Sequence, residues 1–169
     1  MDRDAALADF EEARAAWAAV FARVPDAALR YLKPGDDYSI GGLQVHVNWV
    51  LVHYRRVLEA LIAGHFTALE PLTTAAEWAT AGARAKAGID APQRQEVLDE
   101  MEKLHTSVAA TSRGVAVDDW NRKTPVTYTP GEAPFPTSPD DVLGWLRNHY
   151  REHVEQCPAL VAEWLATRY

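Results

Sequence analysis

Residues 138–154 have the sequence SPDDVLGWLRNHYREHV, and this stretch carries the signals that begin a long helix. Ser138 is a good N-cap because its hydroxyl can accept a hydrogen bond from a free amide of the first turn. Pro139 follows at the first helical position, where a missing amide is harmless, and two acidic residues then face the positive end of the helix dipole. Apolar residues keep roughly helical spacing beyond this point, so we expect a helix that begins at Pro139 and runs towards residue 169.

Three earlier segments, at about residues 5–24, 39–63 and 92–113, show helical periodicity as well. The second of them is apolar around much of its circumference, which is typical of a helix at the centre of a bundle. With the helix from Pro139, the pattern predicts an all-α four-helix bundle, in a single domain over residues 1–169.

Long connections follow the second and third predicted helices. The first connection has a helical pattern near residues 75–86. The second, residues 115–137, contains four prolines and therefore excludes a helix. Within it, residues 115–117 and 126–128 have the composition of short strands and could pair as a small hairpin.

Charge and composition exclude several classes of protein. The chain has 17 Lys and Arg against 24 Asp and Glu, a net charge of −7, which argues against binding to a nucleic-acid backbone. A secretory signal and an apolar run of about 18 residues are both lacking, so we expect a cytoplasmic protein without a membrane span. A single cysteine, Cys157, excludes a disulfide framework and is expected to be a buried structural thiol.

The strongest chemical signal is the pair His149 and His153. A spacing of four residues places both imidazoles on one face of a helix, one turn apart, where they can chelate one metal ion. The same spacing is also typical of a surface pair, or of two core histidines bonded to carbonyl groups.

The second predicted helix offers a third ligand. His46 and His53 lie on nearly the same face but about 10.5 Å apart along the axis, so either one, but not both, can complete the site. Three neutral nitrogen ligands would leave an open position, which is the pattern of a catalytic site. The other histidine would line the same cleft as a proton shuttle, or be a hydrogen-bonded core residue. His105 is a weaker candidate, and His65 is expected at a helix end.

Several segments match the order and spacing of one family's motifs. They are YSIGGLQVH at residues 38–46, DWN at 119–121, and DVLGWLRNH at 141–149, followed by His153 and Gln156. Together they resemble the DinB/YfiT-like family of metal-binding four-helix bundles. The resemblance implies a divalent transition metal, with zinc or nickel favoured, and a homodimer.

The resemblance also chooses among the candidate residues. It implies that the metal ligands are His46, His149 and His153, with His46 preferred over His53. The remaining candidates, expected to line the cleft, are His53, Trp145 and Gln156.

The same resemblance implies kinship with enzymes of three kinds: thiol S-transferases that use bacillithiol or mycothiol, a mycothiol-dependent maleylpyruvate isomerase and a metal-dependent hydrolase. We therefore expect a metal-dependent thiol S-transferase acting on a small molecule, in which Arg55, Arg147 or Arg151 could bind a carboxylate of the thiol. The alternatives are a hydrolase that uses metal-bound water, with His53 or Glu152 as general base, and a non-catalytic metal- or ligand-binding bundle. The sequence assigns no further catalytic residue.

Overall fold

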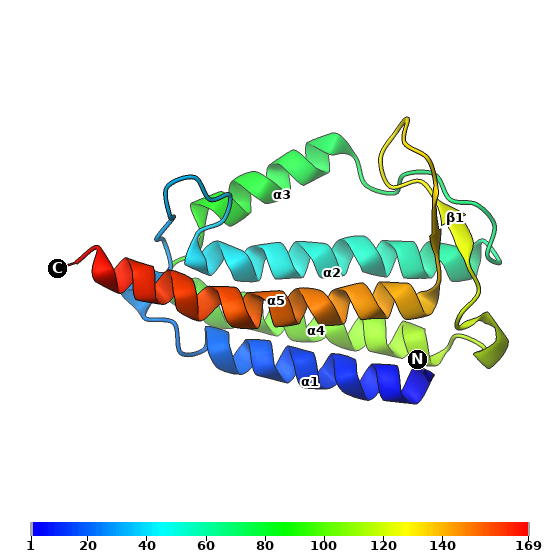
Figure 1. The fold of residues 1–169 in the computed structure, drawn as a ribbon, viewed down its shortest axis with the longest axis horizontal. Helices are drawn as coiled ribbons and strands as arrows, with labels where there is room; N and C mark the ends of the chain where they lie inside the picture. Colours follow the sequence, from blue (N-terminus) through cyan, green and yellow to red (C-terminus); the bar gives the residue numbers. More distant parts are fainter. Residues whose placement is uncertain (1, 169) are drawn as a thin grey trace.

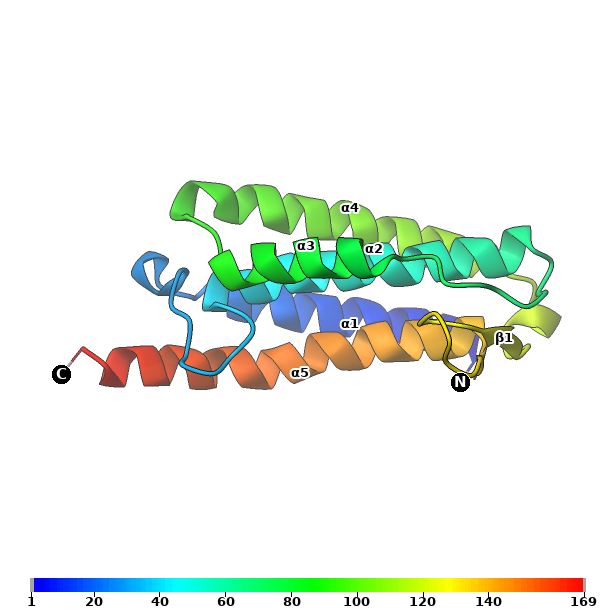
Figure 2. The same cartoon turned by 90° about the horizontal axis from the view of Figure 1, so that it is seen from above.

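Five α-helices make up most of residues 2–168, which the computed structural model describes (Figure 1). Four of them, α1, α2, α4 and α5, form the expected bundle, and α3 lies along the outer side of α2 (Figures 1 and 2). The bounds are α1 Arg3–Phe21, α2 Ile40–Ala63, α3 Ala75–Ala87, α4 Arg94–Arg113 and α5 Pro139–Ala166. Short 3-10 helices span Asp26–Ala28, Ala91–Gln93 and Val117–Asp119.

Serine caps begin the two helices that carry the candidate ligands, and the cap at Ser138 confirms the prediction from the sequence. The Ser39 hydroxyl accepts from the amide of Gly42 at 3.0 Å at the start of α2. At the start of α5, the Ser138 hydroxyl accepts from the amide of Asp141, and the Asp141 carboxylate accepts from the amide of Ser138 at 2.7 Å. This reciprocal pair satisfies two amides that the helix itself leaves free.

A chain of buried polar side chains crosses the apolar core. The indole of Trp17 in α1 donates to Gln44 Oε1 at 2.8 Å, and Gln44 Nε2 donates to Asn48 Oδ1 at 2.7 Å. Asn48 in turn donates to the carbonyl of Val97 in α4 at 2.9 Å. Because a buried polar group left without a partner is expensive, this chain favours one register of α1, α2 and α4.

The first turn of α2 packs very closely on the last turns of α3. The carbonyl oxygen of Ala85 accepts from the amide of Ser39 at 3.2 Å. A Cβ atom added to Gly42 would lie 1.6 Å from that same oxygen, so only a glycine allows this approach.

The predicted hairpin exists, but its pairing was wrong. The strands are β1 Thr124–Val126 and β2 Phe135–Thr137, and residues 115–117 take no part, since Val117 begins a 3-10 helix. Pro125 lies opposite Pro136, where neither residue has to donate a hydrogen bond. Val126 also bridges to Leu69, so the connections after α2 and α4 meet at one end of the bundle.

Within residues 2–168, the helices are all too short or too polar to cross a lipid bilayer.

Candidate metal centre

Three imidazoles from two helices converge inside the bundle. His46 lies in α2, and His149 and His153 lie one turn apart in α5, which packs against α2. The Nε2 atom of His149 is 2.9 Å from that of His46 and 3.2 Å from that of His153. One nitrogen from each residue falls in a group whose members are all within 4.8 Å of one another, so the cluster can hold a metal ion.

Burial keeps these imidazoles uncharged at neutral pH. Burial, with a smaller contribution from the neighbouring imidazoles, lowers the pKa of His46 to about 4 and that of His149 to about 2. Burial also lowers the pKa of His153. The neutral forms are the ones whose nitrogen lone pairs can bind a metal.

A glutamine sets the orientation of His153. Gln156 Oε1 is 2.8 Å from Nδ1 of His153, and because this oxygen can only accept, Nδ1 carries the proton. The lone pair of His153 is therefore on Nε2, the atom that faces the other two imidazoles. A carbonyl that fixes the far side of a histidine in this way is typical of metal ligands.

Hydrogen bonding alone does not account for the cluster. An imidazole nitrogen has either one proton or one lone pair, so Nε2 of His149 cannot bond to both of its neighbours at once. Nitrogen ligands at about 2.0–2.1 Å from a tetrahedral zinc ion would lie roughly 3.3 Å apart, close to the separations of 2.9 and 3.2 Å observed here. The donor set therefore fits a divalent transition metal and leaves coordination positions open.

Replacing Gln156 with alanine should weaken metal binding without removing a ligand. The lost acceptor frees both the tautomer and the ring angle of His153, so we expect the metal dissociation constant to rise roughly 10- to 100-fold. Competitive titration with a chromophoric chelator would measure it. Gln156→Glu keeps an acceptor and serves as the matched control; equal affinity of Gln156→Ala and wild type would argue against this role.

The cluster borders a cavity of about 410 Å³, which lies in the size range of small-molecule sites. His46 and His149 form part of its wall. The other lining residues are Val50, His53, Tyr54, Trp78, Tyr128 and Thr129.

His53 lies in this wall and outside the three-nitrogen cluster. Its Nδ1 is 2.9 Å from the hydroxyl of Thr73, and the side chain is buried. Burial lowers the pKa of His53 to about 4. The bond to Thr73 leaves Nε2 as the ring atom available for proton exchange.

Trp145 and Gln156, the other two residues expected to line the cleft, lie outside the cavity wall. Trp145 packs on Tyr54 and Tyr128, with ring centroids 5.5 and 6.2 Å apart, and does not line the cavity. Gln156 contacts His153, as described above. Sequence reasoning missed Trp78, Tyr128 and Thr73, which come from α3 and the two connections. Aromatic residues outside any helical core pattern were the available signal.

The arginines and Glu152 do not reach the cavity either. Arg147 and Arg151 both pair with Asp9 of α1, the first at 2.9 Å, and Arg55 lies 3.6 Å from Glu59. Glu152 is exposed, and none of these residues lines the cavity.

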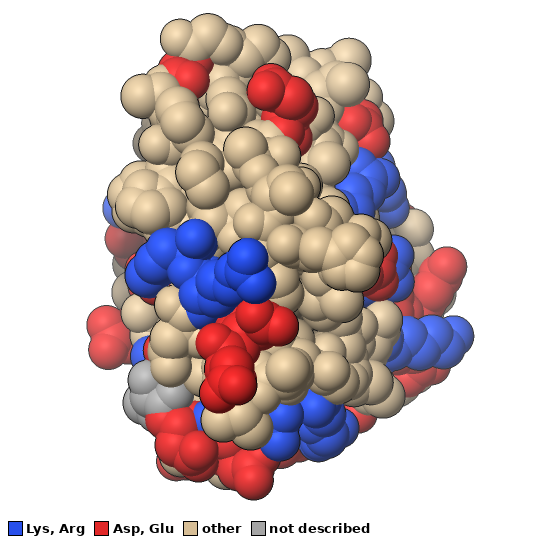
Figure 3. All heavy atoms as spheres, turned by 90° about the vertical axis from the view of Figure 1, so that its right-hand side faces the viewer, with Lys and Arg blue, Asp and Glu red and all other residues tan. Residues whose placement is uncertain are grey.

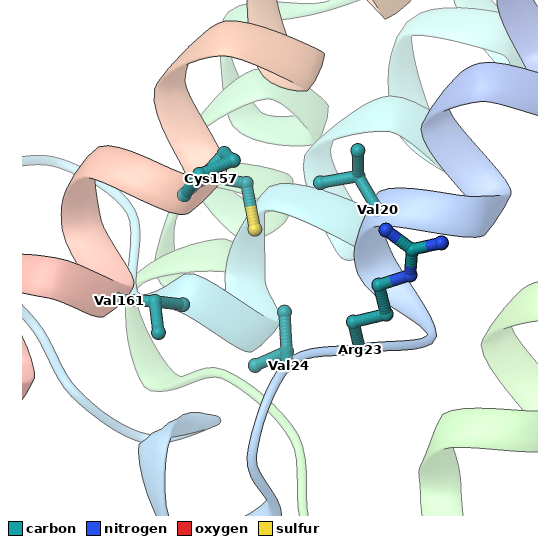
Figure 4. Close-up of a pocket in the computed structure, with 6 residues that line it drawn as sticks. Val20, Arg23, Val24, Cys157 and Val161 are labelled. Atoms are coloured by element: carbon teal, nitrogen blue, oxygen red, sulfur yellow. The ribbon is translucent and has the colours of Figure 1, made fainter.

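Cys157 is buried in the core, as expected. Its thiol borders a separate apolar pocket between the end of α1 and α5, beside Val20, Val24 and Val161 (Figure 4). Burial raises the pKa of Cys157 to about 11, so the thiol stays protonated at neutral pH. This favours a structural role.

His105 and His65 both lie outside the cluster. His105 stacks on Phe10 with ring centroids 4.0 Å apart, and its Nε2 lies 2.9 Å from the carboxylate of Glu11. His65 follows the end of α2 and has a left-handed backbone, with φ of 50°.

The buried His105 predicts a loss of stability in mild acid. Burial lowers its pKa to about 4 from an ordinary 6.5, so its contribution is complete above pH 6.5 and is lost as the pH falls towards 4. Between pH 7.5 and pH 5 we expect His105 to account for about 2 kcal/mol of lost unfolding free energy. Urea unfolding of wild type and His105→Gln at both pH values would measure this; an equal drop in both proteins would contradict it.

The fold and the converging imidazoles define a class: helical bundles with a possible three-histidine metal site. The chain belongs to the DinB superfamily, whose family model matches residues 9–157 and so includes all three histidines. The resemblance seen in the sequence is thereby confirmed. Searches of curated proteins and of solved structures gave no significant match.

Proposed function

We propose that this chain is a metal-dependent thiol S-transferase that uses a low-molecular-weight thiol such as bacillithiol or mycothiol. His46, His149 and His153 would hold the divalent ion, with zinc or nickel favoured. The observation that carries the proposal is that two of these imidazoles also form the wall of a ligand-sized cavity. A metal ion and two small reactants would therefore share one compartment.

The side chains around the cavity have distinct tasks in this reaction. A bound divalent ion would lower the pKa of a thiol bound to it, so that this thiol is nucleophilic at neutral pH. The neutral imidazoles hold the ion, and Gln156 keeps His153 in the binding tautomer. The aromatic rings make much of the remaining wall apolar. His53, fixed through Nδ1 by Thr73, can accept the thiol proton at Nε2.

The transferase activity can be tested with 1-chloro-2,4-dinitrobenzene as electrophile. Protein loaded with zinc or nickel is incubated with bacillithiol, mycothiol or glutathione. In the reaction a carbon–sulfur bond forms, chloride leaves and the thiol proton is released, so absorbance of the thioether reports the rate. We expect turnover with at least one thiol that disappears in the variant His149→Ala/His153→Ala. If no thiol reacts faster than with that variant, the transferase proposal fails.

A hydrolase is the second candidate, and the pair formed by His53 and Thr73 favours it. A histidine held in the cavity wall, uncharged at neutral pH and with its second nitrogen left for proton exchange, is placed to accept a proton from water. The expected result is cleavage of p-nitrophenyl acetate in the absence of thiol, reduced strongly by His53→Gln while metal content is unchanged. Bound metal with neither activity would favour the non-catalytic alternative.

A further inference from the structure

Three aromatic rings from three different parts of the chain line the cavity. Tyr54 comes from α2, Trp78 from α3, and Tyr128 from the connection between β1 and β2. Their ring centroids lie 4.9, 5.0 and 6.0 Å from that of His53. The rings thus surround the part of the cavity next to His53, and two of them belong to elements added outside the bundle.

The wall lacks the side chains that carry a permanent charge. Its eight lining residues include no Asp, Glu, Lys or Arg. Burial lowers the pKa of His53 and raises the pKa of Tyr54 and Tyr128, so these three side chains are uncharged at neutral pH. Glu77, next to Trp78 in the sequence, is paired with Arg56 at 2.8 Å.

The surface at the end of the molecule that carries β1 also has a mostly uncharged region. Figure 3 views the end that carries β1, and its upper part, on the side of α3, is mostly uncharged, while the lysines, arginines and most acids lie lower.

Tyr128 in the wall is hydrogen-bonded within the protein. The hydroxyl of Tyr128 is 3.0 Å from that of Thr137, which holds the tyrosine ring in place. Trp78, by contrast, leaves 38% of its surface exposed. Since large aromatic side chains are usually covered, a half-exposed indole beside a cavity is a surface that a ligand can cover.

We propose that this cavity binds an uncharged aromatic compound, with Trp78 and Tyr128 as the residues that determine specificity. The inference rests on the proposed function, in which this compound is the electrophile that meets the thiol. An aromatic ring gains contact with the indole and phenol faces. Beside His53, where the three rings lie, a carboxylate or phosphate would lose its hydration with no cationic side chain to replace it.

Fluorine NMR on the metal-free protein tests the proposal. The probe is 4-(trifluoromethyl)benzyl alcohol, compared with the anionic 4-(trifluoromethyl)benzoate and with the saturated 4-(trifluoromethyl)cyclohexylmethanol. We expect the aromatic alcohol to bind at least about tenfold more tightly than either analogue. Comparable affinity for the benzoate would overturn the requirement for an uncharged ligand. Comparable affinity for the cyclohexyl compound would overturn the aromatic one.

Variants locate the binding in this cavity. Trp78→Ala should weaken binding of the aromatic alcohol roughly tenfold, and Trp78→Phe should restore most of it. The matched control is Trp164→Ala. Trp164 lies in α5, about 22 Å along the helix from His149, so this variant should bind the aromatic alcohol as tightly as wild type does. Equal affinity of Trp78→Ala and wild type overturns the proposal. Because the measurement needs neither metal nor turnover, its failure is separate from a failure of the transferase proposal.

Discussion

Replacing His149 and His153 together with alanine is expected to abolish metal binding. Wild-type protein, purified without a polyhistidine tag and supplied with zinc or nickel, should carry close to equimolar metal, whereas the double variant should carry almost none. The reason is geometric: only His46 remains, and a single imidazole cannot chelate. Elemental analysis after gel filtration measures the metal content directly.

The control for this experiment is His65→Asn. It also removes a histidine, and asparagine tolerates the left-handed backbone at this position. Metal content should equal that of wild type. If the double variant retained as much metal as His65→Asn, the three-histidine centre would be the wrong assignment.

Changing Gly42 to alanine should cause the largest loss of stability of any glycine-to-alanine change in this chain, because its added Cβ has the shortest contact. The new Cβ would lie 1.6 Å from the carbonyl oxygen of Ala85. The backbone fixes the positions of both atoms, so no side-chain rotation relieves the clash. Either α3 moves off α2, and the hydrogen bond from Ser39 to Ala85 is lost, or α2 begins later. We expect a loss of about 3 kcal/mol in unfolding free energy, at the upper end for overpacked sites, measured by urea denaturation.

Gly82 provides the matched control, since it lies in the middle of α3 with no atom within 4 Å of an added Cβ. Gly82→Ala should be neutral or stabilise the protein by up to about 1 kcal/mol, because alanine is the better helix former. A loss at Gly82 as large as that at Gly42 would show that α3 is sensitive to any change, rather than to the contact with Ala85.

The sequence predicted the helices well because their signals are local. Ser39 and Ser138 satisfy free amides within their own first turns, so their effect can be recognised without knowing the tertiary structure. The hairpin pairing was wrong because the partner of a strand cannot be recognised from one segment alone. Proline is unusual inside a strand, and only the structure shows that Pro125 and Pro136 lie opposite each other, where no donor is needed.

The candidate site also has some residues that local sequence patterns reveal and others that only tertiary packing brings together. The spacing of His149 and His153 is a property of one helix, and the family resemblance supplied His46. Spacing could not show that Trp78 and Tyr128 reach the same cavity, because α3 and the hairpin connection are positioned by packing on the bundle. The cavity wall therefore had to be seen in three dimensions.

The separation of the ligands along the chain has a thermodynamic consequence. His46 and His149 are 103 residues apart, so all three nitrogens come together only when α2 and α5 have docked. A denatured chain offers no more than the pair on α5. Any ion that uses the full set therefore binds the native state preferentially, and mass action makes it a stabilising ligand whose effect grows with the logarithm of its free concentration. The centre thus couples metal availability to the population of folded protein.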